Sequence, residues 1–376
     1  MSTLRVNKLE NTNTSNGGIS IDTSGHVSID GANFPTTGPL SNRNLIINGA
    51  MQVAQRGTSS TANGYGTVDR WKDASSGGGI TQSQQALTTG DPYNEGFRNF
   101  YRLANTTGTT GAGDTREINT NLEAQDIANS GWQYTSSTSY LTLSFWVRAS
   151  VTQTYYGTLR TNDSAVYDYG FSFALTADTW TKVTKTIPGN SNLVFNNDNG
   201  QGLKLALVPF YGTNYTDSGY TLDAWAATSA GSQLPDFTTT WANTNGATFD
   251  FTGVQLEVGS VATPFEHRSF GDELAKCERY YQIIKGGAGV FTSNAAFISL
   301  NFSPMRATPT FTADGVLKFS DTIQNDYTQS SAHLVVGSAT DRGGVTDAQN
   351  LSGTTSGRVA TFISNNGNYI NASAEL

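Results

Sequence analysis

Apolar residues recur with a period of two along most of this chain, which places successive side chains on opposite faces of β-strands. Two runs show the pattern best: Leu141, Leu143, Phe145 and Val147, and then Tyr169, Phe171, Phe173 and Leu175. Further strands are predicted at residues 45–53, 180–187, 203–210 and 248–256, with turn-forming Gly, Asn, Asp and Ser between the strands. The pattern predicts an all-β protein in which residues 44–266 form a β-sandwich jelly roll.

One segment departs from this period. Apolar residues follow one another there at spacings of four, three, four and three, which predicts a connecting helix over residues 267–287. They are Phe270, Leu274, Cys277, Tyr281 and Ile284. The same spacing is that of a coiled-coil seam, so Leu274, Cys277, Tyr281 and Ile284 are predicted to meet their counterparts in a homotrimer. A helix lying on the edge of one sandwich is an equal alternative, because the pattern covers only about two heptads.

Both ends of the chain are predicted to form smaller β structures. In residues 1–43 the tetrapeptide that begins at Ile19 recurs in similar form at Val27. The echo predicts a β-hairpin or short β-coil, which needs a partner surface because an isolated hairpin is marginal in water. We therefore interpret residues 1–43 as an attachment segment. Alternation at Ala296, Ile298 and Leu300 predicts a small β-sandwich module over residues 288–376.

Composition narrows the class of protein. The chain has 376 residues, a net charge of −8 and no visible cluster of Lys and Arg, which argues against nucleic acid as a partner. Its one cysteine, Cys277, excludes an intrachain disulfide, and a buried apolar role for the thiol is favoured. No apolar run is long enough to span a membrane, and no signal peptide is predicted.

Catalytic and metal-binding patterns are weak. The three histidines, His26, His267 and His333, fall in three different predicted modules, so neither a metal site nor a nucleophilic triad is expected, and no cofactor is predicted. Six acidic residues could supply a glycosidase pair, but nothing selects one pair: Glu123, Asp126, Asp163, Asp168, Asp217 and Asp223. A structural calcium ion held by Asp250 or Glu257 is a weak alternative.

Sugar binding is better supported by the residues. Aromatic faces stack on the apolar faces of pyranose rings, while amide and carboxylate groups bond the hydroxyls. Tyr211, Tyr215 and Trp225 fall in predicted strand ends and polar loops, and we predict that they contact glycan. Contacts between subunits are the competing interpretation, which is favoured for Trp146 and about equally weighted for the loop tyrosines.

Two resemblances extend this interpretation. The segment Gln255-Leu256-Glu257, Ala262 to Glu266 and a helix ending in Arg279-Tyr280-Tyr281 resembles virion structural proteins of tailed bacteriophages, especially fibre-like proteins of marine and cyanobacterial phages. The terminal Ala374-Glu375-Leu376 is similar to the last strand of such fibres. Residues 95–260 resemble jelly-roll carbohydrate-binding modules.

The resemblance to fibre proteins implies a tail fibre that docks to the virion through residues 1–43, forms a homotrimer and recognises host-surface glycans. From the residues themselves we expect no enzymatic activity, no nucleic acid partner and no membrane insertion. A capsid-attached head fibre or decoration protein is the alternative within this class. A glycan-degrading tailspike enzyme is the alternative outside it.

Overall fold

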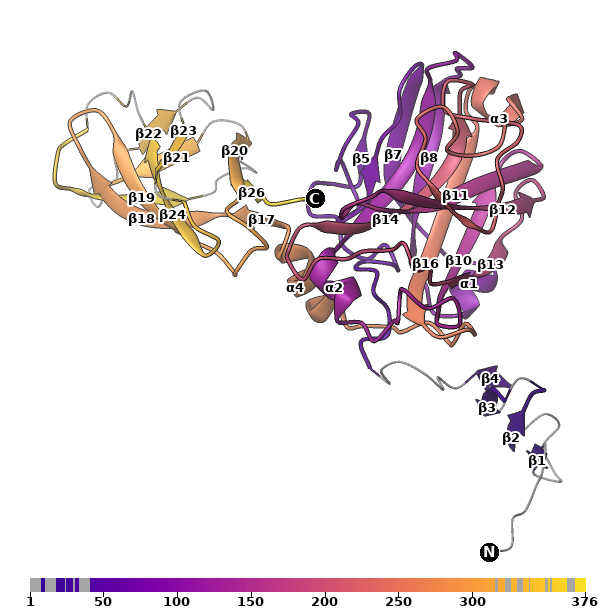
Figure 1. The fold of residues 1–376 in the computed structure, drawn as a ribbon. Coiled ribbons are helices and arrows are strands. Elements are labelled where there is room, and N and C mark those ends of the chain that lie inside the picture. Colours follow the sequence, from indigo (N-terminus) through magenta and orange to yellow (C-terminus); the bar gives the residue numbers. More distant parts are fainter. Residues whose placement is uncertain are drawn as a thin grey trace, which may run out of the picture. The chain divides into compact units, whose positions relative to one another are not determined.

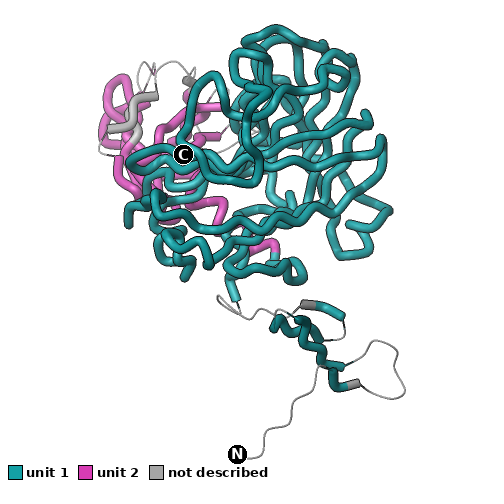
Figure 2. The backbone as a smooth tube through the Cα atoms, turned by 45° about the vertical axis from the view of Figure 1, so that its right-hand side comes forward, with its two compact units in different colours: residues 1–269 teal, residues 270–376 magenta. Residues whose placement is uncertain are grey.

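A computed structural model describes residues 8–10, 18–23, 25–29, 31–33, 41–314, 317–321, 326–329, 334–337, 339–348, 351, 354–363 and 369–376. All other residues, among them His333, lie outside these described ranges. The chain divides into two compact units, Met1–Ser269 and Phe270–Leu376 (Figure 2). We describe each unit by itself.

The jelly roll of the first unit consists of two antiparallel six-stranded sheets (Figure 1). The first, named here the β16 sheet, contains in spatial order β13 (Thr181–Pro188), β10 (Tyr140–Ala149), β16 (Thr248–Val258), β8 (Asn99–Thr107), β7 (Gly79–Ala86) and β5 (Ser59–Ser60). The second, the β14 sheet, contains β15 (Trp225–Ala227), β12 (Tyr167–Leu175), β11 (Gln153–Thr161), β14 (Gln201–Tyr211), β9 (Thr115–Glu123) and β6 (Lys72–Asp73). Three short helices lie in the connections: α1 (Asp91–Asn94), α2 (Ala124–Ala128) and α3 (Thr240–Asn243).

The core lies between the inner faces of these sheets. Phe145 and Phe249 of the β16 sheet pack against Phe173 of the β14 sheet, with ring centroids 5.5 and 6.4 Å from that of Phe173. Phe145 and Phe249 are fully buried and Phe173 is 6% exposed. Burying a side chain of this size stabilises a fold by roughly 1.5–3 kcal/mol. The prediction of a jelly roll is confirmed.

Residues 45–53 are an exception, because the predicted strand there was wrong. The segment forms turns, in which Asn48 has a φ of +58°. The Asn48 side chain accepts a hydrogen bond from the Val53 amide and donates one to the Val53 carbonyl, at 3.0 and 2.8 Å. A side chain that bonds its own backbone in this way competes with sheet pairing.

The motif that begins at Gln255 closes the jelly roll. The Glu257 carboxylate accepts hydrogen bonds from the Thr263 amide and hydroxyl, at 2.9 and 2.6 Å. Gln255 Oε1 accepts from the Glu266 amide at 2.8 Å, and Glu266 accepts from the Asn44 amide at 3.0 Å. The last strand, the chain after it and the start of the domain are thus joined by buried side-chain bonds. We name Asn44, Gln255, Glu257, Thr263 and Glu266 the closing latch.

Asp250, which was suggested as a calcium ligand, pairs with two arginines. Its two oxygens accept from Arg102 Nε and Nη2, both at 2.8 Å, and Oδ2 also accepts from Arg148 Nη2 at 2.7 Å. Two guanidinium groups therefore occupy the carboxylate, and Glu257 is occupied by the closing latch. Both carboxylates suggested as calcium ligands thus serve internal pairing in this structure.

The described part of the N-terminal segment forms a small antiparallel sheet. Its strands are β1 (Lys8–Glu10), β2 (Gly18–Ile21), β3 (Val27–Ile29) and β4 (Ala32–Asn33), paired in sequence order. The echoed tetrapeptides pair with each other, since Ile19 lies opposite Ile29 and Ile21 opposite Val27. A β-hairpin at the repeat was therefore predicted correctly.

The second unit begins with α4 (Phe270–Glu278) and continues as two sheets. A three-stranded sheet contains β17 (Tyr281–Ile284), β26 (Tyr369–Ser373) and β20 (Thr310–Asp314). A seven-stranded sheet contains, in order, β22 (Asp326–Gln329), β21 (Leu317–Ser320), β25 (Val359–Ile363), β18 (Gly286–Phe291), β19 (Ala296–Asn301), β24 (Gly343–Ala348) and β23 (Leu334–Gly337). Ile284, Ile298, Phe362 and Ile370 belong to one buried cluster of this unit.

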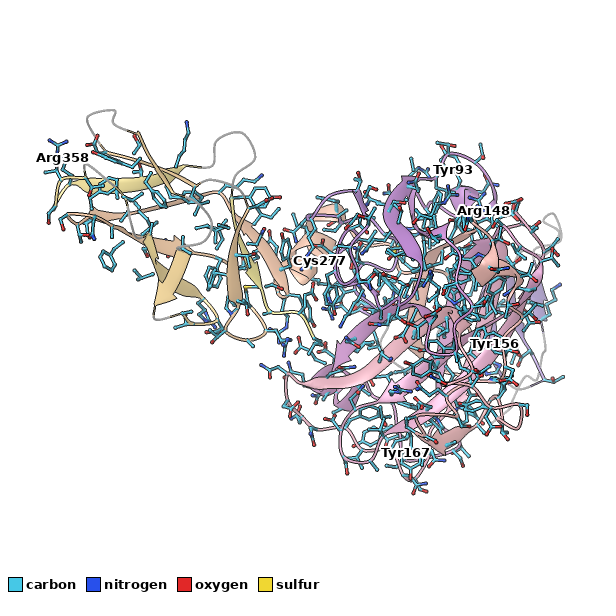
Figure 3. The ribbon with its side chains drawn as sticks, turned by 90° about the horizontal axis from the view of Figure 1, so that it is seen from above. Tyr93, Arg148, Tyr156, Tyr167, Cys277 and Arg358 are labelled. Atoms are coloured by element: carbon cyan, nitrogen blue, oxygen red, sulfur yellow. The ribbon has the colours of Figure 1, made fainter. Side chains whose placement is uncertain are left out.

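The helix is shorter than predicted, which removes the proposed seam. It ends at Glu278, and Tyr281 and Ile284 lie in β17, paired with β26. Tyr281 donates to Asn371 Oδ1 at 2.6 Å, and Ile284 is buried in the core of the unit. Cys277 is fully buried (Figure 3) and Leu274 is half-buried. The continuous seam of Leu274, Cys277, Tyr281 and Ile284 was therefore wrong, because cross-strand pairing overrides the helical spacing after Glu278.

Candidate functional site: the outer face of the β14 sheet

The outer face of the β14 sheet carries a strip of polar side chains. On β9 the core positions Ile118 and Leu122 alternate with Glu117, Asn119 and Asn121, which therefore point away from the core. Strand pairing places these residues beside Lys204 of β14 and Arg160 of β11. We name the polar strip as the set Glu117, Asn119, Asn121, Arg160, Asp168, Gln201 and Lys204.

Glu117 is the centre of one half of the polar strip. Its carboxylate accepts from Lys204 Nζ at 2.9 Å, from Asn119 Nδ2 at 2.8 Å and from the Tyr211 hydroxyl. Burial opposes ionisation of Glu117, but the Lys204 charge and these hydrogen bonds prevail and hold its pKa below the usual range. Glu117 is therefore ionised, and its carboxylate oxygens accept hydrogen bonds from the neighbouring side chains.

Arg160 forms the other half. It binds Asp168 through two bonds, Nε to Oδ1 at 2.6 Å and Nη2 to Oδ2 at 3.0 Å, and it also donates to Gln233 Oε1 at 2.7 Å. Burial favours the neutral guanidine, but the bond to Asp168 outweighs it, so the pKa of Arg160 is raised. Each cation of the strip is thus matched by one carboxylate, and the strip has no net charge.

Aromatic side chains lie next to the polar strip. The Tyr211 and Tyr215 rings are 5.7 Å apart, and Phe237 lies 6.1 Å from Tyr211 and 4.7 Å from Tyr156. Phe237 belongs to the long connection between β14 and α3, residues 212–239, which contains β15 and which we name the strap. Leu234 of the strap is fully buried on the same face. The strap therefore covers part of the sheet with apolar contacts and leaves Tyr156 and Tyr215 half-buried at its margin, whereas Tyr211 is buried.

Polar atoms beneath the strap lack partners. Gly170, Thr158, Ala206 and Asn119 form one row across four strands. Within the described part of the chain, the buried Thr158 hydroxyl and Asn119 Oδ1 have no hydrogen-bond partner. A side chain at Gly170 would meet the Tyr220 hydroxyl at 2.8 Å, so the strap lies directly on this row. Burial raises the pKa of Tyr220 to about 12.

The predicted glycan contacts do not form one surface. Tyr211 was expected to be exposed at a strand end or in a loop; it ends β14 but is only 5% exposed, with its hydroxyl bound to Glu117. Tyr215 lies beside it and is half-buried. Trp225 pairs with Tyr169 on the core side of the sheet and donates from Nε1 to Pro188 O at 2.7 Å. The exposed positions predicted for Tyr211 and Trp225 were wrong, and only Tyr211 and Tyr215 are brought together.

Trp146 likewise differs from its prediction. It points outward from the β16 sheet, but it is 8% exposed because Phe97, Leu87 and Ala50 pack on that face. Its Nε1 donates to Glu95 Oε2 at 3.0 Å. The chain itself occupies the position that was expected to contact another subunit.

Sequence reasoning missed the polar strip. Alternation in residues 115–123 was the available signal, with Ile118, Thr120 and Leu122 in one phase and Glu117, Asn119 and Asn121 in the other. The inward-facing Arg116 disguised it. That side chain is fully buried and donates from Nε to Asn105 Oδ1 at 2.9 Å.

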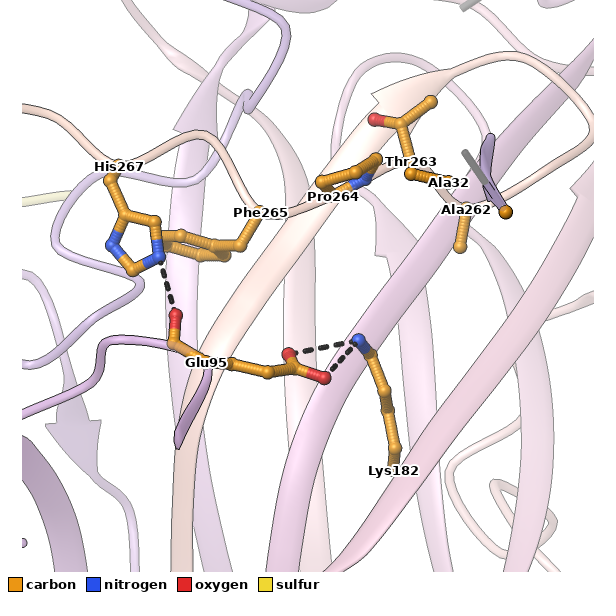
Figure 4. A pocket seen from close by; sticks show the side chains of 9 residues that line it. Ala32, Glu95, Lys182, Ala262, Thr263, Pro264, Phe265 and His267 are labelled. Carbon is orange, nitrogen blue, oxygen red and sulfur yellow. Dashed lines mark hydrogen bonds and ion pairs between the residues drawn. The ribbon is translucent and has the colours of Figure 1, made fainter. Parts of the chain in front are cut away.

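A cavity of about 590 Å³ lies elsewhere in the first unit (Figure 4). Its lining residues are Gly31, Ala32, Glu95, Lys182, Ala262, Thr263, Pro264, Phe265 and His267. Lys182 Nζ donates to both oxygens of Glu95, at 3.0 and 2.9 Å, and a His267 ring nitrogen lies 3.0 Å from the Glu95 carbonyl oxygen. Its charged groups thus bind each other, as those of the polar strip do, but its lining contains no tyrosine, which makes this cavity a weaker candidate than the β14 sheet.

The described ranges contain neither a metal-binding cluster nor a membrane-spanning helix. No group of three or more His, Cys, Asp or Glu side chains that could hold a metal ion is present among those residues. No helix within them has the length and apolar character needed to cross a membrane.

Comparison with known proteins gives distant matches only. No family model matches the sequence, and no curated protein matches it. The tailspike protein 4 enzymatically active domain of bacteriophage CBA120 aligns with 57% of this chain at 10% identity and a TM-score of 0.31, and this chain spans only 21% of that domain's length.

Two further solved structures have comparable scores. A putative sugar binding protein from Bacteroides thetaiotaomicron aligns over 58% of this chain and 100% of its own, at 12% identity and a TM-score of 0.31. A cyclase from Fischerella aligns over 61% and 100%, at 11% identity and a TM-score of 0.32. A tailspike domain, a putative sugar binding protein and a cyclase share this level of similarity, so function has to be argued from the residues.

Proposed function

We propose that this chain is a structural protein of a tailed-phage virion, most specifically a tail fibre that attaches through residues 1–43 and binds host-surface glycan. It works as a homotrimer, by adhesion, without a cofactor or nucleic acid. Repetition of weak sites on identical copies raises the strength of attachment through multivalency. A capsid-attached head fibre or decoration protein is the alternative, and it would use the same fold.

The observation that carries the proposal is the pairing of an aromatic margin with a neutral polar strip on one sheet face. Tyr156 and Tyr215 are half-buried, so each ring keeps part of its surface open for stacking on a sugar. Lys204 and Arg160 lie on the same face of the sheet and keep donors at a partly open surface. This combination suits a polyhydroxylated ligand.

The same geometry favours binding over hydrolysis. Glycoside hydrolysis uses a carboxylic acid whose pKa is raised so that it can protonate the leaving group. Glu117 has a lowered pKa instead, and both oxygens of Asp168 are engaged by Arg160. A glycan-degrading tailspike remains the alternative of a different class. Incubation with host polysaccharide tests it, since release of new reducing ends contradicts the adhesive function.

Glycan binding is tested by titration of the full chain with host-surface polysaccharide. Loss of one stacking ring at a partly exposed site is worth roughly 0.5–1.5 kcal/mol, so Tyr215→Ala is expected to weaken binding about 2- to 13-fold. Tyr93→Ala is the matched control, because Tyr93 is a half-buried tyrosine of α1 stacked under Arg98 at 4.1 Å (Figure 3). Equal affinity of both variants would remove the β14 face from the proposal.

A further inference from the structure

Exposed apolar side chains are distributed unevenly over the chain. Residues 41–269, all of which are described, expose only two large aliphatic side chains, Val166 and Val194. The described parts of the N-terminal sheet expose four, Leu9, Ile19, Ile21 and Ile29. The second unit exposes Val290, Phe297, Val345 and Val359 on strands, and Phe270 on α4. Scattered single residues need no explanation, but adjacent ones do.

The four strand residues of the second unit are neighbours on one face. Val359, Val290 and Phe297 lie directly opposite one another across β25, β18 and β19. Val345 of β24 lies opposite Ser299, two residues after Phe297. We name Val290, Phe297, Val345 and Val359 the bare face of the seven-stranded sheet.

The opposite face of this sheet is the buried one. On β19, Ala296, Ile298 and Leu300 are buried and alternate with the exposed Phe297 and Ser299. A sheet with apolar residues on both faces needs a layer on each side. Within the described residues, the bare face has none.

The N-terminal sheet repeats this arrangement. Leu9, Ile19 and Ile29 form one cross-strand row, since Leu9 pairs with Ile19 and Ile19 pairs with Ile29. On the other face the Ser20 and Ser28 hydroxyls bond each other at 2.5 Å. The aliphatic row, rather than the hydroxyl face, is therefore the exposed one, at 41–55% of each residue. We name Leu9, Ile19, Ile21 and Ile29 the aliphatic row.

We propose that both surfaces are contacts between copies of this chain: the bare face packs on the bare face of another copy, and the aliphatic row on the aliphatic row. The outward positions of β18, β19 and β25 include no charged residue, and their described members are Gly286, Ala288, Val290, Phe297, Ser299, Asn301, Val359 and Thr361. Charged residues stand on the two flanking strands: Asp347 of β24 lies opposite Phe297, and Lys318 of β21 precedes by two residues Ser320, which pairs with Thr361. The three central strands can therefore meet their own copy without like-charge repulsion, as a symmetric contact requires.

The size of the two surfaces explains why both take part. Strand spacing of about 4.8 Å and a two-residue rise of about 6.7 Å give an area on the order of 250 Å² for two rows over four strands. The same estimate for three strands of the N-terminal sheet gives about 190 Å². Neither approaches the roughly 800 Å² that each partner buries in a stable interface. Together, with a polar rim making up about a third of the contact, they come close to it.

Sedimentation velocity on the full chain tests this assignment, over a concentration range from about 1 to 50 μM. The parent chain is expected to associate. The double variant V290T/F297S and the double variant I19T/I29T are each expected to raise the dissociation constant at least tenfold. The matched control is V166T/V194T, which removes the two exposed valines of the jelly roll and is expected to associate like the parent.

The outcomes separate this inference from the proposed function on which it rests. A parent chain that stays monomeric over the range, or a V290T/F297S variant that associates like the parent with an unchanged circular dichroism spectrum, overturns the inference. A dimer instead of a trimer supports these contacts and contradicts the proposed trimer. Glycan affinity, measured with a short oligosaccharide, is expected to be equal in the parent chain and the V290T/F297S variant, so each proposal can fail alone.

Discussion

The outer faces of the β14 sheet and the seven-stranded sheet differ in how far the chain covers them. The β14 sheet has polar pairs on one part of its outer face and its own strap, residues 212–239, over another part. The seven-stranded sheet exposes Val290, Phe297 and Val359, and the connection between β18 and β19, two of the strands that carry these residues, is only residues 292–295. A loop of this length cannot cover a sheet, whereas a long connection such as the strap can. The chain thus covers part of the β14 sheet by itself, and in the proposed assembly a second copy covers the bare face.

The largest test of this comparison uses two adjacent residues of β19. Ile298 is fully buried and Phe297 is 39% exposed. Ile298→Ala is expected to lower the free energy of unfolding of the second unit by about 2–5 kcal/mol, because it leaves a cavity. Phe297→Ala is expected to cost less than about 1 kcal/mol in dilute, unassociated protein. Hydrogen exchange of the β19 amides measures both.

Tryptophan fluorescence provides the control for that experiment. All six tryptophans lie in the jelly roll, at positions 71, 132, 146, 180, 225 and 241. Fluorescence therefore follows the first unit, and its transition is expected to be unchanged in both variants. If Phe297→Ala proved as costly as Ile298→Ala in the monomer, the bare face would already be covered within one chain, and the comparison would fail.

The sequence predicted the architecture better than the site. Alternation in residues 141–147 and 169–175 identified strands, because burial on one face imposes a period of two. It failed at residues 45–53, where the Asn48 side chain replaces ladder bonds, and at Tyr281, where a helical spacing continues into a strand. The position of Tyr211 depends on a bond to Glu117, 94 residues away. No local pattern encodes such a partner.

The chemistry of the quoted motif was also beyond a local pattern. Residues 255–266 carried a resemblance to a class of proteins, while in the structure they form part of the closing latch. Glu266 bonds the amides of Arg43 and Asn44, more than 200 residues earlier, at 3.1 and 3.0 Å. A sequence pattern shows that such residues occur together, but only the fold shows that they hold the two ends of the jelly roll.

The closing latch gives a second test, with an expected effect of intermediate size. It concerns the jelly roll. Burial of Glu266 opposes ionisation, but the Asn44 amide and the Arg268 charge prevail and lower its pKa. A lowered pKa in the folded state adds stability above the unfolded value, and this stability is lost as the pH falls through the folded pKa. Glu266→Gln is therefore expected to destabilise the jelly roll by about 1–3 kcal/mol at pH 7.

Denaturant unfolding followed by tryptophan fluorescence checks this expectation at pH 7 and near pH 3. The difference between parent and variant should shrink at the lower pH, because the parent then loses the charge that the variant never has. A difference that is independent of pH would show that the shape of the latch, and not the Glu266 charge, closes the domain.

The smallest expected effect has the opposite sign and concerns the inner side of the β14 sheet. Asp73 of β6 is 1% exposed, and burial raises its pKa to about 6. Its Oδ1 accepts from the Ser75 hydroxyl at 2.6 Å, whereas Oδ2 has no partner. The ionised carboxylate is therefore a cost to the folded state at pH 7. Asp73→Asn keeps the acceptor for Ser75, removes the charge and is expected to stabilise the jelly roll by about 1–2 kcal/mol.

The sign of the pH dependence makes that expectation specific. A raised folded-state pKa means that the folded protein binds the proton more tightly than the unfolded chain, so the parent gains stability as the pH falls from above 6 towards 4. The advantage of Asp73→Asn should narrow over the same interval, while the deficit of Glu266→Gln persists until the pH falls below about 4.5. If the stability advantage of Asp73→Asn stayed constant from pH 7 to 4, then packing, and not ionisation of Asp73, would limit stability at this edge of the sheet. The jelly roll would then lack the charge cost inferred for its interior.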